Sequence, residues 1–150
     1  MVFRIIYWLL DFIWLASYPR SGNYFVRTIL FHCFNIKTGS LYYDDCYGNK
    51  ELSNYVGHLE HKNRSTTLEI DFPKDQIKIL KTHSLHNDNR KTIYIIRDGR
   101  ASLVSLYEYY GKKFSLKTIM EGKTIYGKWC DHIDFWDPLY RRDTLLLSYE

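Results

Sequence analysis

Short apolar runs that end in polar residues recur along this chain, and they constrain its fold more than any other feature. Each run has the length and the β-branched or aromatic content of a buried strand. The predicted strands lie within residues 12–17, 77–83, 91–100 and 143–150, and the strand in the third stretch ends at Arg97. Strands that alternate with helices predict an α/β fold, with a mainly parallel sheet flanked by helices.

The segments between these runs place apolar residues at helical spacing. The predicted helices cover residues 23–35, 100–111, 115–121 and 123–136. Residues 36–76 are polar and contain several glycines, so we predict a variable insertion that holds short helices. A chain of 150 residues is long enough for one core, and we predict a single domain over residues 1–150.

A polar cluster follows each of the predicted strands. The clusters are Arg20-Ser21-Gly22, Lys81-Thr82-His83, Arg97-Asp98 and Tyr149-Glu150. Parallel strands bring their carboxyl ends to one edge of a sheet, and ligands of such sheets bind beyond that edge. The sequence therefore predicts one site that all four clusters share.

Positive charge is concentrated in the second half of the chain. Residues 77–130 contain eleven Lys or Arg and four Asp or Glu, whereas the net charge of the whole chain is only +4. We therefore expect an anionic ligand in this half. A charge run is usually a solvated face, and the overall excess is mild, so we expect no nucleic-acid partner.

The stretch "SYPRSGNYF" at residues 17–25 joins a predicted strand to a predicted helix through a tight turn. Such a turn points backbone N–H groups at an anion. Gly22 permits a backbone conformation or a close approach that a Cβ would block, and Arg20 adds a permanent positive charge. A phosphate or a sulfate fits these features. The turn lacks the Lys-Ser or Lys-Thr that metal-dependent nucleotide kinases need, and an ordinary strand–helix turn with a surface arginine is the alternative.

Two further pairs of residues have a possible chemical role. Lys81 and His83 lie two residues apart, so they share one face of an extended chain, where His83 could act as a base and Lys81 could stabilise an anion. Arg97 and Ser105 could bind a second phosphate. The alternatives are a strand-end histidine beside a surface lysine, and an ion pair of Arg97 with an acidic neighbour.

The cysteines and the N-terminus indicate a reduced, cytoplasmic protein. The three cysteines have no CxxC spacing, and His58 and His61 have no cysteine pair beside them, so we predict no metal site. The apolar run "MVFRIIYWLLDFIWLA" is interrupted by Arg4 and Asp11, which makes it too short for a membrane span. We predict no transmembrane segment.

Five segments, in order, resemble the sulfotransferases that use 3′-phosphoadenosine 5′-phosphosulfate (PAPS). "SYPRSGNYF" at 17–25 is similar to the family's 5′-phosphosulfate loop, and "LKTH" at 80–83 to its K-T-H strand end. "IYIIRDGRASLVSLYEYY" at 93–110 resembles the 3′-phosphate segment. "YGKWCDHIDFW" at 126–136 and "LLLSYE" at 145–150 match two later landmarks. The resemblance implies a three-layer α/β fold like that of P-loop NTPases.

The resemblance also implies an activity, which is metal-independent transfer of a sulfuryl group from PAPS to a hydroxyl or amine. In this scheme His83 is the general base, Lys81 stabilises the transferring group, and Arg20 neutralises the leaving 5′-phosphate. The implied cofactor contacts are Arg20, Ser21, Gly22, Asn23 and Tyr24 at the 5′ end, Arg97 and Ser105 at the 3′-phosphate, and Phe25 and Tyr149 at the adenine. The acceptor would be a small molecule, a carbohydrate or a lipid.

The sequence departs from the family pattern at several points. Tyr24 replaces a common threonine, Phe25 a tryptophan and Arg20 a lysine. The family continues after "YE" with a basic loop that completes the 3′-phosphate site, so we expect a domain that is incomplete at its C-terminus. A non-catalytic relative that binds PAPS, or the product 3′-phosphoadenosine 5′-phosphate (PAP), without turnover is the alternative.

Overall fold

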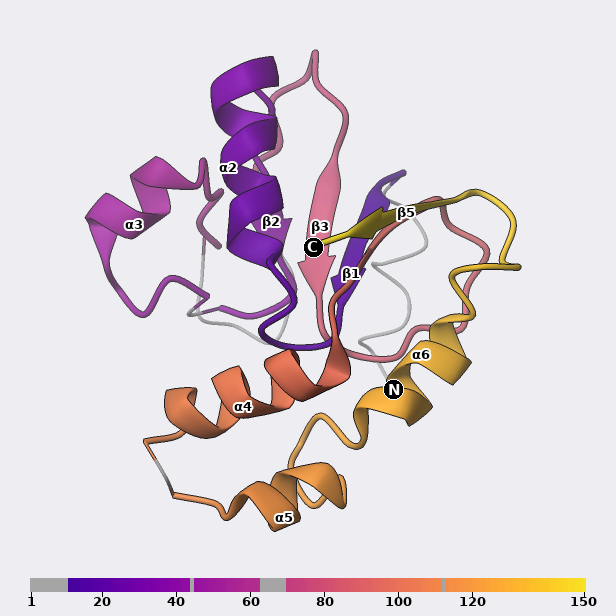
Figure 1. The fold of residues 1–150 in the computed structure, drawn as a ribbon. Helices are drawn as coiled ribbons and strands as arrows, with labels where there is room; N and C mark the ends of the chain where they lie inside the picture. The colour runs from indigo at the N-terminus through magenta and orange to yellow at the C-terminus, as the bar shows by residue number, and fades with distance from the viewer. Residues whose placement is uncertain (1–10, 44, 63–69, 112) are drawn as a thin grey trace. The chain divides into compact units, whose positions relative to one another are not determined.

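The computed structural model describes residues 11–43, 45–62, 70–111 and 113–150. The elements, in chain order, are β1 (Ile13–Ser17), α2 (Asn23–Phe34), β2 (Gly39–Ser40), α3 (Lys50–Tyr55), β3 (Ile79–Thr82), β4 (Thr92–Ile96), α4 (Gly99–Tyr109), α5 (Leu116–Met120), α6 (Trp129–Trp136) and β5 (Thr144–Ser148) (Figure 1). The strands form one sheet in the order β2-β3-β1-β4-β5. Both β2 with β3 and β4 with β5 pair in parallel, which confirms the predicted α/β class.

The described chain divides into two compact units, and the boundary passes through β1. The first unit holds residues 11–14 and 24–82, and the second holds residues 15–23 and 83–150. The turn after β1 and the residues that follow β3, β4 and β5 therefore all belong to the second unit.

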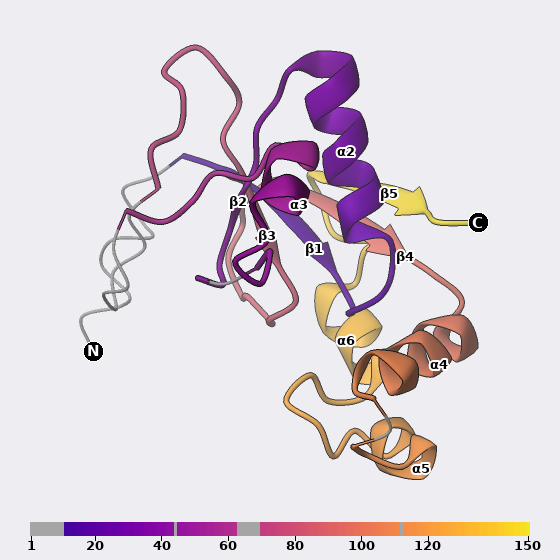
Figure 2. The ribbon, with the colours of Figure 1, turned by 90° about the vertical axis from the view of Figure 1, so that its left-hand side faces the viewer.

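In the first unit, helix α2 lies along strands β2 and β3 in both ribbon views (Figures 1 and 2). The helix ends at Phe34 because Asn35 adopts a left-handed backbone with φ of 53° and the Ile36 N–H bonds the Leu30 carbonyl at 2.9 Å. Strand β2 places Ser40 opposite Lys81 of β3. This pairing sets Lys81 in the buried part of the unit.

In the second unit, β4 and β5 pair along their full length, from Thr92 opposite Thr144 to Ile96 opposite Ser148. Helix α4 begins after Asp98, whose side chain accepts a hydrogen bond from the Arg100 N–H and so caps the helix. A buried apolar cluster of Tyr18, Leu106 and Ile119 joins the turn after β1 to helices α4 and α5. This cluster thus packs Tyr18, the first residue after β1, against both helices.

The predicted strands and the first three predicted helices are confirmed, with small shifts at their ends. The prediction of a helix over 123–136 is wrong for its first part, because α6 begins only at Trp129. Gly122 and Gly127 have φ values of 72° and 68°, which a helix cannot contain. The short strand β2 was not predicted, since two residues carry too little pattern.

The apolar N-terminal run falls largely on residues 1–10, which lie outside the described residues. Among the residues that are described, no helix has the length and apolar character needed to cross a bilayer. A cytoplasmic location stays a prediction.

Candidate active site

The turn after β1 has an unusual backbone. Arg20 has a φ of 67° and Gly22 a φ of 96°, while Ser21 between them has a negative φ and is almost fully buried. Backbones that alternate in handedness in this way direct successive N–H groups into one concave surface, which suits an anion. Helix α2 begins at the next residue, Asn23. The backbone of the turn therefore suits an anion, and the binding of one stays a prediction.

Arg97 and Ser105, the predicted pair for a second phosphate, contact this turn directly. The Arg97 Nη1 donates to the Arg20 carbonyl at 2.8 Å, and the Arg20 Nε donates to the Ser105 Oγ at 3.1 Å. Ser21 and Ser102 hydroxyls lie 3.4 Å apart beneath the turn. Hydrogen bonds thus join residues that follow β1 and β4 to one another and to residues of α4.

Tyr149, which follows β5, covers the glycine of the turn. A Cβ placed on Gly22 would overlap the Tyr149 ring, so only glycine fits beneath this ring. The Arg97 guanidinium lies 4.5 Å from the centroid of the same ring, and the Arg20 guanidinium lies 5.2 Å from that of Tyr109. Each of the two cations therefore has an aromatic face that limits its orientation.

His83 lies one residue beyond β3, with its ring against the end of β1. Its Nδ1 is 2.8 Å from the Ser17 carbonyl oxygen. A carbonyl only accepts, so Nδ1 carries the proton and the basic lone pair of the neutral ring is on Nε2. The Ser17 hydroxyl in turn accepts from the Asn23 amide at 3.4 Å. His83 consequently has the tautomer that a general base acting through Nε2 requires.

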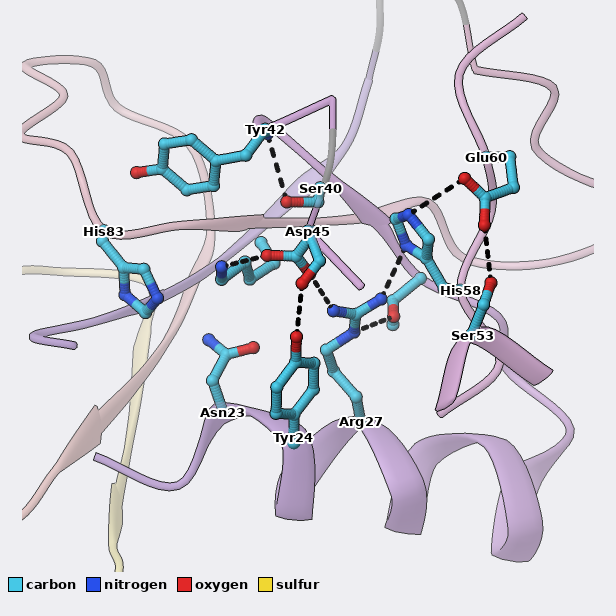
Figure 3. Close-up of polar contacts among 12 residues, drawn as sticks. Asn23, Tyr24, Arg27, Ser40, Tyr42, Asp45, Ser53, His58, Glu60 and His83 are labelled. Atoms are coloured by element: carbon cyan, nitrogen blue, oxygen red, sulfur yellow. Dashed lines mark hydrogen bonds and ion pairs between the residues drawn. The ribbon is translucent and has the colours of Figure 1, made fainter. Parts of the chain in front are cut away.

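Lys81 belongs to the first unit, where it contacts the buried carboxylate of Asp45, a residue labelled in Figure 3. Asp45 accepts hydrogen bonds from the Lys81 ammonium and, through its other oxygen, from the Arg27 guanidinium. Burial opposes the charge on Asp45, but the two cations outweigh it and lower its pKa to about 2. Burial also lowers the pKa of Lys81, although Asp45 works against that shift. The carboxylate of Asp45 thus stays charged between two cations, whereas burial dominates the pKa of Lys81.

Arg27 extends this network across the first unit. Its Nε donates to the Thr38 hydroxyl at 2.8 Å. Its Nη2 donates to the His58 Nδ1 at 2.8 Å, a contact that Figure 3 marks between the labelled Arg27 and His58. The Tyr24 hydroxyl donates to the Asp45 carbonyl, and burial raises the pKa of that phenol. Tyr24, predicted at the 5′ end of the cofactor, therefore has its hydroxyl engaged with the loop that carries Asp45.

One group of described residues has the ligand types of a metal site, namely Asp45, Cys46 and His58. Arg27 already donates to the carboxylate and to the His58 Nδ1, so the proton of neutral His58 must lie on Nε2. Burial keeps the Cys46 thiol protonated by raising its pKa. A cation here would face the positive charges of Arg27 and Lys81, so the donor set favours ion pairing over metal binding.

The structure thus sorts the predicted site residues into two groups. The second unit brings together Arg20, Ser21, Gly22, Asn23, His83, Arg97, Ser105 and Tyr149. The first unit holds Lys81, Tyr24 and Phe25, and the Phe25 ring is 60% exposed.

Sequence reasoning missed Arg27, Asp45 and Ser102. The sequence contains one indication of Arg27. It is a charged residue, four positions after Asn23, among the apolar positions of the predicted helix.

The fold and the turn define the class of this chain as an α/β protein with a tight turn between its first strand and the helix that follows. Within that class, the model of the sulfotransferase domain matches residues 10–150, and the chain belongs to this family. Sulfotransferase 2A1 of Rattus norvegicus is 31% identical over 159 residues, covering 90% of this chain and 51% of the relative. Sulfotransferase 4A1 of Homo sapiens is 24% identical over 160 residues, covering 92% and 53%. The chain spans about half the length of the curated relatives that it matches.

Solved structures share the fold. Mouse sulfotransferase SULT7A1 complexed with PAP superposes with a TM-score of 0.58 at 21% identity, over 93% of this chain and 51% of that one. Retinol dehydratase in complex with retinol and PAP superposes with a TM-score of 0.59 at 16% identity, over 91% and 54%. These likenesses confirm the expected sulfotransferase fold.

Proposed function

We propose that this chain binds PAPS and transfers its sulfuryl group to a hydroxyl or amine acceptor without a metal ion. The observation that carries the proposal is the set of hydrogen bonds that ties Arg97, Arg20 and Ser105 together around the turn after β1. Two cations and a hydroxyl from three elements meet at an anion cradle, as recognition of a nucleotide with two phosphate groups requires. Membership of the sulfotransferase family supports the same activity.

Two features of the structure fit such a ligand. The Arg97 Nε is buried and lacks a hydrogen-bond partner among the described residues, with the Glu150 carboxylate 3.8 Å away, so it can donate to a phosphate oxygen. Gly22 lets the Tyr149 ring approach the backbone of the turn closely. PAPS would supply the activated sulfuryl group, and the residues of this chain would bind and orient it.

We assign roles to the residues around the cradle as follows. The backbone of Ser21, Gly22 and Asn23 would hold the 5′ end of the cofactor. Tyr24, in the first turn of α2, would lie beside them. Arg97 and Ser105 would bind the 3′-phosphate. Arg20 adds a permanent positive charge. Its family counterpart neutralises the leaving 5′-phosphate, but the hydrogen bond of Arg20 to Ser105 favours a role at the 3′-phosphate in this chain.

His83 would take the proton of the acceptor. Its Nδ1 donates to the Ser17 carbonyl, so the lone pair on Nε2 can accept a proton from an attacking hydroxyl. Lys81 would stabilise the negative charge on the transferring group. Phe25 and Tyr149 would pack against the adenine, for which their aromatic rings are suited.

A non-catalytic relative that binds PAP without turnover is the second candidate. The observation that favours it is the Lys81 ammonium, which is engaged by the Asp45 carboxylate and buried. A lysine held in this way contributes to transfer only if the bound cofactor competes with Asp45 for it.

The decisive experiment is calorimetric titration of PAP without metal, followed by transfer of radiolabelled sulfate from PAPS to a panel of phenols, sterols and sugars. We expect PAP to bind, and we expect the His83→Ala variant to lose transfer while it keeps PAP binding. His86→Ala is the matched control, since it removes another partly buried imidazole from the same unit. PAP binding without transfer to any acceptor would favour the non-catalytic relative, and no binding by folded protein would refute both candidates.

A further inference from the structure

A buried histidine that the proposed mechanism does not use contacts the proposed base. His132 of helix α6 is 2% exposed, and its Nε2 lies 3.1 Å from the carbonyl oxygen of His83. Its Nδ1 lies 2.8 Å from the hydroxyl of Tyr94, a fully buried residue of β4. All three residues belong to the second unit.

The directions of these hydrogen bonds are fixed by chemistry. The His83 carbonyl can only accept, so the His132 Nε2 must carry a proton. Burial lowers the pKa of His132 to about 4, so the ring is neutral at physiological pH and its Nδ1 is an acceptor. Tyr94 is therefore the donor to Nδ1, and burial raises the pKa of its phenol, which keeps the donor protonated.

The chain of donors continues into the proposed active site. Tyr94 donates to His132, His132 donates to the backbone of His83, and the ring of His83 donates to the Ser17 carbonyl. His83 lies one residue beyond the end of β3. A side-chain donor therefore holds its carbonyl at the point where the strand ends, and the ring and the backbone of His83 both take part in hydrogen bonds.

We propose that His132, itself oriented by Tyr94, is a positioning residue that holds His83 in the geometry and tautomer needed for proton abstraction. The proposal rests on the assignment of His83 as the base. Hydrogen bonds in a dry, low-dielectric interior are directional and costly to leave unmade, which suits them to fixing one arrangement. The surrounding rings of Tyr18 and Trp136, with centroids 5.7 and 6.5 Å from that of His132, exclude water from it.

Three variants separate positioning from packing. His132→Leu removes the donor to His83, and His132→Gln keeps an N–H donor at the place of Nε2. Tyr94→Phe removes only the hydroxyl that orients His132. We expect kcat to fall about tenfold or more in His132→Leu, with the KM for PAPS unchanged. A positioned general base contributes ~10²-fold or more to the rate, and misplacing it should lose part of that contribution. His132→Gln should recover most of this loss, and His86→Leu should cause none.

Nitrogen NMR of the His83 ring provides a readout that needs no turnover. In the unchanged protein the ring nitrogens should report a proton on Nδ1, and in His132→Leu they should report a mixture of tautomers. An unchanged His83 spectrum in His132→Leu, or equal kcat values for His132→Leu and His132→Gln, would overturn the proposal. If His132→Leu fails to fold, Tyr94→Phe makes the same comparison with a smaller change. A shifted spectrum in a protein without transfer activity would uphold the positioning and refute the proposed reaction instead.

Discussion

The buried carboxylate of Asp45 offers the sharpest test of the energetics of this structure. Its two oxygens accept from Arg27 and Lys81, whose side chains are 0% and 8% exposed. Asp45→Asn keeps the size of the side chain and removes its charge. Two buried cations then lose their counter-charge and cannot reach water, so we expect a large loss of stability at neutral pH.

Two routes give the size of that loss. Removing one partner of a buried ion pair costs about 3–5 kcal/mol. The fall in the pKa of Asp45 from 3.8 to about 2 corresponds to about 2 kcal/mol, at roughly 1.4 kcal/mol for each pKa unit. The second figure is smaller because it counts only the preference for the charged carboxylate in its native surroundings. Either loss is a large part of the ~5–15 kcal/mol that stabilises a typical domain.

The pH dependence has a definite sign. The folded pKa of Asp45 is lower than its unfolded pKa, so its contribution is complete above about pH 4 and is lost as the pH falls toward about 2. Urea denaturation followed by circular dichroism, at pH 7 and again near pH 3, measures both effects. The Asp45→Asn variant should be less stable at pH 7 and should lose less stability on acidification.

The control is Asp75→Asn, which alters an exposed aspartate of the same unit. This variant should match the unchanged protein within about 0.5 kcal/mol. If Asp45→Asn were as stable as Asp75→Asn, or kept the full acid sensitivity of the unchanged protein, the reasoning about the buried carboxylate would be refuted.

Two further predictions concern the cradle. Gly22→Ala should lower both the melting temperature and the affinity for PAP, because the added Cβ would meet the Tyr149 ring and because residue 22 has a φ of 96°. Melting curves and calorimetry would measure the two effects, and an unchanged affinity would contradict the prediction. Arg97→Ala should weaken binding of PAP more than binding of adenosine 5′-phosphosulfate, which lacks the 3′-phosphate; equal losses in the two titrations would mean that Arg97 acts only on the structure of the turn.

The sequence was sufficient to predict that residues after different strands meet, because parallel α/β topology brings strand ends together. Arg97 and Tyr149 are far apart along the chain, yet each follows a strand of the sheet, and their side chains meet at 4.5 Å. The turn itself was predictable from Pro19 and Gly22, since few residues other than glycine adopt a φ of 96°. The local sequence pattern and the sheet topology were therefore sufficient to predict where these residues lie.

The partner of Lys81 could not be predicted in this way. The alternation of a strand places Lys81 and His83 on one face, but it says nothing about a carboxylate 36 residues earlier in the chain. Asp45 lies in the polar, glycine-containing segment where no periodicity exists. The predicted start of the helix at residue 123 was wrong for a related reason. The apolar spacing continues through Gly127, although the backbone there is left-handed.

The pairing of Lys81 with Asp45 raises an objection to the proposed chemistry, since a neutralised lysine attracts anions weakly. Arg27 answers it. Arg27 and Lys81 share the single carboxylate of Asp45, and the guanidinium of Arg27 keeps its charge although burial lowers the pKa of Lys81. A simple pair of Lys81 and Asp45 would lack this second cation. We therefore expect the cluster to attract an approaching anion more strongly than such a pair would.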